Sequence, residues 1–277
     1  MTINCQGNLI DLSKPKILGI LNITPDSFYD GGTLQKEQHI IPKVEKMLMD
    51  GADFIDLGGY SSRPGAKNIS IEEEINRVAP VVDLLKNKFP DILLSIDTFR
   101  SDVAKTCLDK GAAIINDISA GSIDEKMIKT VAQYKVPYIM MHMKGTPQNM
   151  QSLANYKNIT QEVIFYFSQK IAHARSLGIS DIIIDAGFGF AKTVSQNFEL
   201  LNHLDQLKAL KTPLLTGISR KSMIYKTLNS TAKEALNGTS ALHMIALQKG
   251  STILRVHDIK EAKECILLHE ALLESHN

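Results

Sequence analysis

The 277-residue sequence predicts a single α/β domain, a (β/α)8 TIM barrel spanning residues 1–277 with its active site at the carboxyl ends of the strands. Short β-branched runs alternate with helical patterns along nearly the whole chain. The runs are almost continuously apolar, as buried parallel strands are, and there are enough of them to close a barrel. The alternative is an open doubly wound sheet, which is disfavoured because no GxGxxG segment follows the first strand.

Eight segments are expected to be strands because each is a short apolar run bounded by turn residues. In chain order they are residues 16–22, 54–58, 92–97, 113–116, 137–142, 181–185, 213–217 and 252–256. The intervening segments carry apolar residues at helical spacing. One such set is Ile75, Val78, Val81, Val82 and Leu85. No linker or low-complexity tract divides the chain, so we expect one domain.

The charge balance excludes a general attraction to nucleic acid or to anionic membranes. Lysine and arginine total 31, aspartate and glutamate total 30, and the formal net charge is +1. The three cysteines show no CxxC spacing, which argues against a disulfide framework and a structural zinc site. The first twenty residues lack a signal-peptide apolar stretch, and no apolar run approaches the ~18 residues of a membrane helix. We therefore expect a cytoplasmic protein.

Polar residues end, or closely follow, every expected strand. They are Asn22, Asp56, Asp97, Asn116, His142, Asp185, Ser219 and Arg255. In a closed parallel barrel the carboxyl ends of all strands meet on one face, so these positions would converge on one cleft. The segments 24–36 and 59–70 are long and Gly-rich, and we expect them to be lids over that face.

Arginine is concentrated near the same strand ends, whereas the helix surfaces use mostly lysine. Four of the six arginines follow strands: Arg63, Arg100, Arg220 and Arg255. Guanidinium binds phosphate in a bidentate manner, and barrels commonly hold phosphate near the last two strands, where Arg220, Arg255 and His257 would lie. This favours an anionic substrate. Arg100 opens a helical segment, and a surface salt bridge is the expected role for it.

Eight segments together resemble the signature segments of the dihydropteroate synthase family. In order they are ILGILNITPDSFYDGG, DLGGYSSRPGA, SIDTFRSDVA, INDISAG, IMMHMKGTPQNMQ, DAGFGFAKT, GISRKSMI and RVHDI. The resemblance covers about residues 16–260. It implies a transferase of folate biosynthesis that condenses 6-hydroxymethyl-7,8-dihydropterin pyrophosphate with p-aminobenzoate, releasing pyrophosphate. It also implies a homodimer, and competition between sulfonamides and p-aminobenzoate.

The resemblance implies four anchors for the pterin ring. Asp185 matches the residue whose carboxylate accepts two parallel N–H bonds from the ring. Asn116 would bind the neighbouring ring edge, Asp97 would face a ring N–H, and Lys221 would donate to the ring carbonyl. A helix cap is the structural alternative for Asp97, but Ser101 is better placed to cap the helix that follows.

The diphosphate would be held by charge-assisted bonds. Arg63, Ser62, Arg255 and His257 match the family positions for it. Asn22 would offer an oxygen to Mg²⁺, which typically takes one or two protein ligands together with water and phosphate.

Catalysis on the ring side is expected from Asp97, Asp56 and Lys221. The leaving group departs from a methylene on an electron-rich ring, so positive charge can build up on the pterin, and the two carboxylates would offset it. No covalent enzyme intermediate is needed.

The amine substrate needs an apolar slot and one anion binder. Phe28, Pro64, Phe190 and the aliphatic part of Lys221 match the family's wall, and Ser219 would bind the carboxylate of p-aminobenzoate.

Neighbouring residues are assigned other roles. Phe188 is left open between a core residue and a wall residue of the site, and we interpret His142 as part of the scaffold of the site. Residues 24–28 would belong to a lid.

Two segments depart from the family pattern. Tyr60 and Ser62 stand where Glu and Thr are common, and Ala186 and Ala191 stand where Pro and Gly are common. The loss of the Glu puts any ionic contact it makes in relatives in doubt. Two alternative functions are a methyltransferase-type pterin-binding module and a non-catalytic pterin-binding paralogue. The former has no use for Arg63 or His257, and turnover with p-aminobenzoate would exclude the latter.

Overall fold

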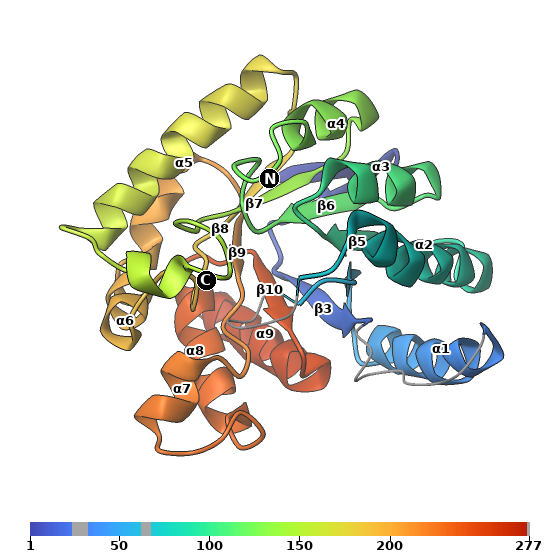
Figure 1. Cartoon of the computed structure of the whole chain (residues 1–277). Coiled ribbons are helices and arrows are strands. Elements are labelled where there is room, and N and C mark those ends of the chain that lie inside the picture. The colour runs from blue at the N-terminus through green and yellow to red at the C-terminus, as the bar shows by residue number, and fades with distance from the viewer. Residues whose placement is uncertain (24–32, 62–67, 276–277) are drawn as a thin grey trace.

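A computed structural model describes residues 1–23, 33–61 and 68–275 of the chain. Eight parallel strands close into a barrel in the order β10-β3-β4-β5-β6-β7-β8-β9, and helices surround it (Figure 1). The first and last barrel strands close the ring through parallel pairs such as Arg255 with Leu18. The predicted (β/α)8 barrel is thus confirmed, and the open doubly wound sheet is excluded.

The barrel strands lie where the apolar runs predicted them. Two have the expected bounds, and the other six differ by one or two residues at one or both ends. They are β3 (Lys16–Asn22), β4 (Phe54–Gly58), β5 (Leu94–Asp97), β6 (Ile114–Asp117), β7 (Tyr138–Met141), β8 (Ile182–Asp185), β9 (Leu214–Thr216) and β10 (Ile253–Val256).

In the described part of the chain, helices connect successive strands, and short 3-10 segments occur among them. They are α1 (Thr33–Met49), α2 (Ile71–Lys88), α3 (Ser101–Asp109), α4 (Met127–Tyr134), η2 (Met150–Leu153), α5 (Ile159–Ser176), α6 (Val194–Asn202), η3 (Leu204–Leu210), α7 (Ser222–Thr227), α8 (Leu236–Gln248) and α9 (Ile259–Glu274). Side-chain caps begin several of them. Ser70 accepts from the N–H of Glu73 at α2, and Thr193 forms a reciprocal capping box with Gln196 at α6.

The cap expected at α3 is wrong. Arg100 occupies the cap position and makes no side-chain cap bond. Ser101 is instead the first helical residue, and its backbone N–H donates to Asp124 Oδ2 at 2.7 Å. A carboxylate from the next βα loop therefore satisfies a helix N–H that a local cap would otherwise take.

Alternation along the strands separates two apolar regions. Residues of one parity face the helices and form the larger core, which includes Ile55, Ile96 and Ile184. Residues of the other parity fill the barrel interior. They are Leu18, Phe54, Ile114, Ile139, Ile183, Leu215 and Ile253.

An N-terminal hairpin that the sequence reading did not anticipate closes the amino end of the barrel. It consists of β1 (Thr2–Cys5) and β2 (Asn8–Asp11), which pair antiparallel. Ile3 and Cys5 are buried in the same cluster as the barrel interior. The Gln6–Gly7 turn has positive φ at both residues, 54° and 88°, which suits the twist of a two-residue hairpin.

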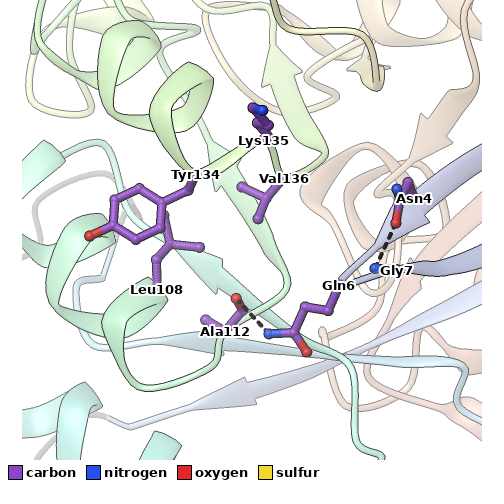
Figure 2. A pocket seen from close by; sticks show the side chains of 8 residues that line it. All are labelled: Asn4, Gln6, Gly7, Leu108, Ala112, Tyr134, Lys135 and Val136. Carbon is purple, nitrogen blue, oxygen red and sulfur yellow. Dashed lines mark hydrogen bonds between the residues drawn. The ribbon is translucent and has the colours of Figure 1, made fainter.

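A shallow cavity of about 330 Å³ lies between this hairpin and the ends of α3 and α4 (Figure 2). Gln6 spans its floor and donates to the carbonyls of Gly111 and Ala112. The cavity lies beside the amino ends of β6 and β7 and thus opposite the face where the strands end.

Cys5, Cys107 and Cys265 are all buried, and none forms a disulfide. Among the residues that the structure describes, no helix is long and apolar enough to cross a membrane.

Asp117 organises the turn after β6 from a fully buried position. Its carboxylate accepts from the hydroxyl of Tyr138 at 2.6 Å, from the N–H and hydroxyl of Ser119, and from the N–H of Gly121. Burial raises the pKa of Asp117, and these donors oppose the shift. The network holds the loop that directly follows Asn116.

We expect Tyr138→Phe to lower the free energy of unfolding by about 1.5–3 kcal/mol, because it removes a buried hydrogen bond to a charged group. Tyr134→Phe is the matched control, since Tyr134 makes its hydrogen bond to Asp109 at the solvent-exposed surface. We expect the control to change the free energy by less than about 0.5 kcal/mol. Urea denaturation measures both, and equal losses would contradict the role given to Asp117.

Candidate active site

Several polar residues at the carboxyl rim continue the inward-facing rows of the barrel strands. Asp56, Asn116, Asp185 and Arg255 each lie two residues beyond a residue of the apolar interior, on the same strand. Because side chains two apart share a face, these four side chains project over the apolar floor. Asp97, the last residue of β5, belongs to the same rim.

Arg255 bridges two carboxylates from neighbouring strands. Its Nε donates to Asp56 Oδ2 and its Nη2 to Asp97 Oδ2, both at 2.6 Å. Asn116 Nδ2 donates to the same Oδ2 of Asp56 at 2.9 Å. Residues from β4, β5, β6 and β10 therefore meet in one network, as the barrel geometry predicted. Asp56 Oδ1 is buried and has no hydrogen-bond partner within the described part of the chain, so it remains an acceptor.

A second group adjoins this network at the end of β9. A Cβ on Gly217 would lie 3.6 Å from Asp185 Oδ2 and 3.8 Å from both Arg255 Cβ and Lys221 Nζ. The absent side chain of Gly217 thus leaves space that Asp185, Lys221 and Arg255 share. The Nζ of Lys221 donates to the carbonyl of Phe188 and lies 5.0 Å from the ring centroid of Phe190.

Asn22 reaches the rim on the other side of Asp97. A Cβ on Gly58 would lie 3.6 Å from Asn22 Oδ1 and 3.6 Å from Asp97 Oδ2. In the described ranges, no cluster of three or more His, Cys, Asp and Glu residues could hold a metal ion by itself. One amide oxygen beside the rim fits Mg²⁺ held jointly with a phosphate-bearing ligand, because this ion keeps most of its shell as water and phosphate.

Ser219 and His257 form a pair at the ends of β9 and β10. Ser219 Oγ lies 3.2 Å from His257 Nδ1, and it accepts from the backbone N–H of His257 at the same distance. Arg220 turns away from them. Its guanidinium binds Asp258 through Nε at 2.7 Å and Nη2 at 2.9 Å, and it also donates to backbone carbonyls. Arg220 therefore stabilises the loop instead of lining the rim.

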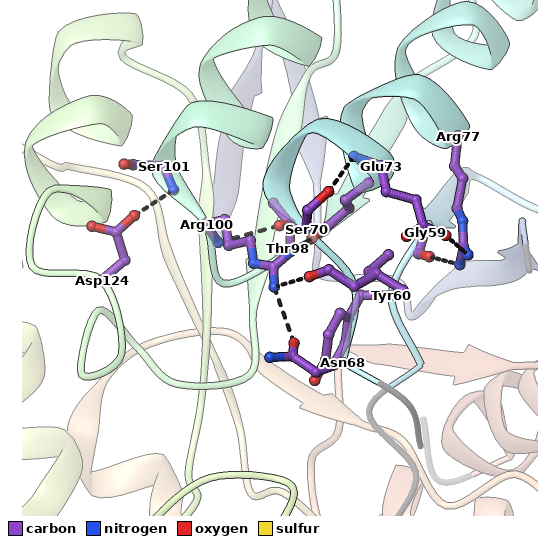
Figure 3. Close-up of polar contacts among 12 residues, drawn as sticks. Gly59, Tyr60, Asn68, Ser70, Glu73, Arg77, Thr98, Arg100, Ser101 and Asp124 are labelled. Carbon is purple, nitrogen blue, oxygen red and sulfur yellow. Dashed lines mark hydrogen bonds and ion pairs between the residues drawn. The ribbon is translucent and has the colours of Figure 1, made fainter.

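The surface salt bridge expected for Arg100 is wrong, because its partner is buried. Arg100 Nη1 donates at 2.8 Å to Glu74, whose side chain is 0% exposed, and Thr98 Oγ1 donates to the other carboxylate oxygen at 2.7 Å. Arg100 Nη2 donates to the carbonyl of Ile69 at 2.7 Å. It also donates to Asn68 Oδ1 at 3.2 Å (Figure 3). The pair joins α2 to the turn after β5, directly behind Asp97, and Arg100 stays outside the rim.

Tyr60, which replaces a common Glu of the family pattern, lies in this cluster. Its ring meets Phe99 edge-on with centroids 5.1 Å apart, and the guanidinium carbon of Arg100 lies 5.2 Å from its centroid. Its hydroxyl accepts from Gln148 Nε2 at 2.9 Å. Tyr60 therefore links the segment after β4 to the segment after β7.

Some predicted site residues lie outside the described residues. They are Phe28, Ser62, Arg63 and Pro64. The lid predicted for residues 24–28 lies outside them as well. Phe188, for which the sequence leaves both a core and a wall role open, is fully buried in the core, whereas Phe190 is partly exposed.

An apolar cluster beside Phe190 was not recognised in the sequence. It contains Ile118, Met141, Met143, Met150 and Ala191, with Phe99 and Phe190 packed against it. From the sequence, the IMMHM run at residues 139–143 predicts only a strand and its end. The side chains that follow β7 pack against those of the loop after β8 and form an apolar wall next to the polar rim. The sequence does not show this contact, because it depends on how the loop after β7 folds back.

Burial shifts the pKa values of the rim carboxylates and of Lys221. Burial, with the nearby Asp56, raises the pKa of Asp97 to about 7, although Arg255 opposes the shift. Burial also raises the pKa of Asp185, opposed by Lys221. Burial lowers the pKa of Lys221 to about 8, opposed by Asp185. Burial disfavours the charge of Arg255, but Asp56 and Asp97 outweigh it and raise its pKa.

The arrangement can bind the edge of a flat, polar ring and can stabilise charge of both signs. Carboxylates accept from N–H groups, and Asn116 and Lys221 can donate to ring nitrogens and oxygens. Arg255 and the hydroxyl of Ser219, which pairs with His257, can donate to an anionic group of a ligand. All of these groups lie in a partly water-excluded rim, where electrostatic interactions are strong.

Comparisons with known proteins agree with this chemistry. The family model described as pterin binding enzyme matches residues 18–257. Dihydropteroate synthase of Escherichia coli (strain K12) is 41% identical over 277 residues, covering 99% of this chain and 98% of the relative. A crystal structure of Yersinia pestis dihydropteroate synthase with a sulfonamide drug complex has a TM-score of 0.92 at 38% identity, covering 99% of this chain and 100% of that one. A Xanthomonas albilineans dihydropteroate synthase structure with 4-aminobenzoic acid has a TM-score of 0.90 at 34% identity, covering 98% of each chain.

We expect Asp97→Asn to flatten the pH dependence of stability. Because the pKa of Asp97 is raised from 3.8 to about 7, the folded state binds an extra proton between these values. Stability therefore falls as the pH rises through this window, by about 2 kcal/mol between pH 5 and 8 from this group. Urea denaturation of both proteins at the two pH values measures the difference, and parallel losses would show that Asp97 is not the titrating group.

Proposed function

The chain belongs to the dihydropteroate synthase family of pterin binding enzymes and catalyses the family's reaction. We propose that the carboxyl rim of the barrel binds both substrates next to each other. In this reaction, 6-hydroxymethyl-7,8-dihydropterin pyrophosphate condenses with p-aminobenzoate to give 7,8-dihydropteroate and pyrophosphate. One observation carries the proposal for the rim. Asp56, Asp97, Arg255 and Asn116 form one network, and Asp185 and Lys221 adjoin it.

The pterin ring binds at the carboxylate side of the rim. Asp185 accepts the paired N–H groups of the ring, and Asn116 binds the adjacent edge. Lys221, whose Nζ shares the space beside Gly217 with Asp185, donates to the ring carbonyl. The unpartnered Oδ1 of Asp56 supports a ligand N–H at this edge, because a buried acceptor without a partner is costly.

The carboxylates also assist bond breaking. The bond between the exocyclic methylene and the diphosphate oxygen breaks, the diphosphate leaves with the electron pair, and positive charge develops on the pterin and its methylene. Asp97 and Asp56 stabilise that charge because they are fixed before the reaction begins. Each correctly placed group contributes about 3 kcal/mol to lowering the barrier, by analogy with single oxyanion-hole donors.

The diphosphate binds on the arginine side. Nε and Nη2 of Arg255 hold the two carboxylates, so we assign Nη1 to a phosphate oxygen, with His257 beside it. Ser62 and Arg63 keep their predicted roles in this half of the site. Asn22 is the residue that would hold Mg²⁺. When bound, this ion would neutralise charge on the departing diphosphate.

p-Aminobenzoate binds between Phe190, the stem of Lys221 and Ser219. The 5.0 Å distance between Lys221 Nζ and the Phe190 ring supports one continuous wall. Ser219 donates to the carboxylate, and Phe28 and Pro64 keep their predicted roles in the wall. Sulfonamides mimic this substrate and compete with it. The aniline nitrogen bonds to the exocyclic methylene that the diphosphate has left and then loses a proton to water.

The reaction needs no enzyme nucleophile. Burial raises the pKa of Cys5 and Cys107 to about 12, and it raises that of Cys265 as well. A buried thiol that keeps its proton is a poor nucleophile, which supports direct transfer between the two substrates.

We assign a homodimer to the exposed apolar face of α8 and α9, which pack against each other. Ile245, Leu267, Leu268, Leu272 and Leu273 are 39–61% exposed. An apolar face of this kind on packed helices favours an interface with a second copy. The cytoplasmic location stays a prediction from the sequence.

We expect the wild-type chain to sediment as a dimer and Leu268→Glu to sediment as a monomer, because a charge would be buried in the interface. Phe165→Glu is the control, since Phe165 on α5 is 64% exposed and lies outside this face. Sedimentation equilibrium distinguishes them. A monomeric wild type, or a dimeric Leu268→Glu, would contradict the assignment.

A coupled assay for pyrophosphate tests the proposed reaction. We expect pyrophosphate release to require both substrates.

A binding experiment tests the proposed pterin site. We expect Asp185→Asn to weaken the binding of 6-hydroxymethylpterin by tenfold or more, since a buried site that loses a charged acceptor loses about 1.5–3 kcal/mol. Asp181→Asn is the control, because Asp181 precedes β8 at the opposite end of the barrel. Calorimetry measures the affinities. Near-normal binding by Asp185→Asn would remove Asp185 from the pterin site.

A further inference from the structure

Lys192 is a buried lysine that the proposed reaction does not use. It lies on the loop between β8 and α6, and it is only 4% exposed. Its Nζ lies 3.0 Å from His142 Nδ1, and it donates to the carbonyls of Gly187 at 2.9 Å and Phe190 at 3.0 Å. It also donates to the carbonyl of His142 at the longer distance of 3.4 Å. The three shorter contacts match the three protons of an ammonium group.

The loop is folded tightly around this ammonium group. Gly187, Gly189 and Ala191 all have positive φ, at 69°, 83° and 47°. A Cβ on Gly187 would lie 2.0 Å from the carbonyl oxygen of His142, so the loop backbone contacts the end of β7 directly. This left-handed geometry turns the carbonyls of residues 187 and 190 toward one point, where Lys192 Nζ lies.

The other side of the same loop supports the pterin end of the rim. Asp185 Oδ1 accepts from the N–H of Gly187 at 2.8 Å. The carbonyl of Phe188 accepts from Lys221 Nζ, and the Phe190 ring lies beside that lysine. Each contact therefore comes from a residue within the segment that Lys192 holds from behind.

We infer that Lys192 is a positioning residue for the pterin end of the site, which holds the 187–190 loop against His142 and supplies the buried positive charge behind Asp185. It touches neither substrate in this arrangement and acts through the loop and the carboxylate. The inference rests on the proposed pterin role of Asp185.

The charges around Lys192 support this role. Burial lowers its pKa to about 7; Asp185 opposes the shift, and Lys221 and Lys144 add to it. His142 faces it as a neutral acceptor, because burial lowers the pKa of His142 to about 2. Lys192 in turn helps to hold down the raised pKa of Asp185, together with Lys221, the N–H of Gly187 and Arg255. Loss of the ammonium charge should therefore make Asp185 easier to protonate.

The inference is tested with Lys192→Met, which keeps a side chain of similar length and removes the charge. Calorimetry measures the affinity for 6-hydroxymethylpterin between pH 4.5 and 8. We expect weaker binding. In the pH profile of affinity, we expect the acidic limb, where affinity is lost as the pH falls, to move to higher pH by about one unit, which is the pKa shift typical of a nearby buried charge. The matched control is Lys170→Met. Lys170 Nζ also donates to a loop carbonyl, that of Ala120 at 2.9 Å, but on the loop after β6. The control should leave the acidic limb in place.

A second pair of variants covers the case in which Lys192→Met does not fold. His142→Asn keeps an acceptor near the position of Nδ1, whereas His142→Leu removes it. We expect Asn to preserve the acidic limb and Leu to shift it in the same direction as Lys192→Met.

The outcomes separate this inference from the proposed site. If Asp185→Asn abolishes binding while the Lys192 and His142 variants keep the wild-type acidic limb, the role of Lys192 is refuted and the pterin site stands. An equal shift in Lys170→Met also refutes it. If Asp185→Asn binds normally, the pterin site itself fails, and the positioning role fails with it.

Discussion

The bridge that Arg255 makes between Asp56 and Asp97 is the contact on which the rest of the rim depends. It joins β10 to β4 and β5 with two bonds of 2.6 Å in a region where Asp56 is fully buried. Removing one partner of such a group leaves an uncompensated buried charge, which costs several kcal/mol. One guanidinium between two carboxylates also leaves negative charge at the rim. The net negative charge of the two carboxylates suits a ring on which positive charge develops. Arg255 can still donate to an anion bound next to that ring.

The loops of this face are held from behind by other buried ionisable groups. Asp117 accepts hydrogen bonds from the loop after β6 and from Tyr138. The Glu74–Arg100 ion pair holds the turn after β5. Lys192 donates to two carbonyls of the loop after β8. In each case a charge meets several partners, so it is satisfied without solvent. These groups reduce the freedom of the loops that carry Asp97, Asn116 and Asp185. A reaction that depends on fixed charges benefits from this rigidity, because the groups need no rearrangement as charge develops.

Periodicity predicted the barrel because it reports directly on burial. Near-continuous apolar strands such as those at residues 54–58 can only be buried on both faces, and this requires helices on one side and a filled interior on the other. The N-terminal hairpin escaped prediction because its strands are four residues each and Gln6–Gly7 is a weak turn signal. Ser101 was expected to cap α3, but it is the first residue of the helix, and Asp124 from a neighbouring loop accepts from its N–H. Contacts between loops that are distant in the sequence have no local pattern.

The fold class, the family and the strand ends where polar residues gather could be predicted from the apolar pattern and the motif segments. Side chains alternate along each strand, and the strand ends of a closed parallel barrel meet on one face. Tertiary structure alone decided how those residues pair. Arg255 lies near the end of β10 and Arg220 follows β9, and the two look alike in the sequence. Arg255 nevertheless bridges two rim carboxylates, whereas Arg220 binds Asp258 away from the rim. Lys192 likewise reads as a loop lysine until the fold brings His142 and two carbonyls around it. The physical reason is that the partner of a buried charge is set by three-dimensional proximity, which spacing along the chain does not encode.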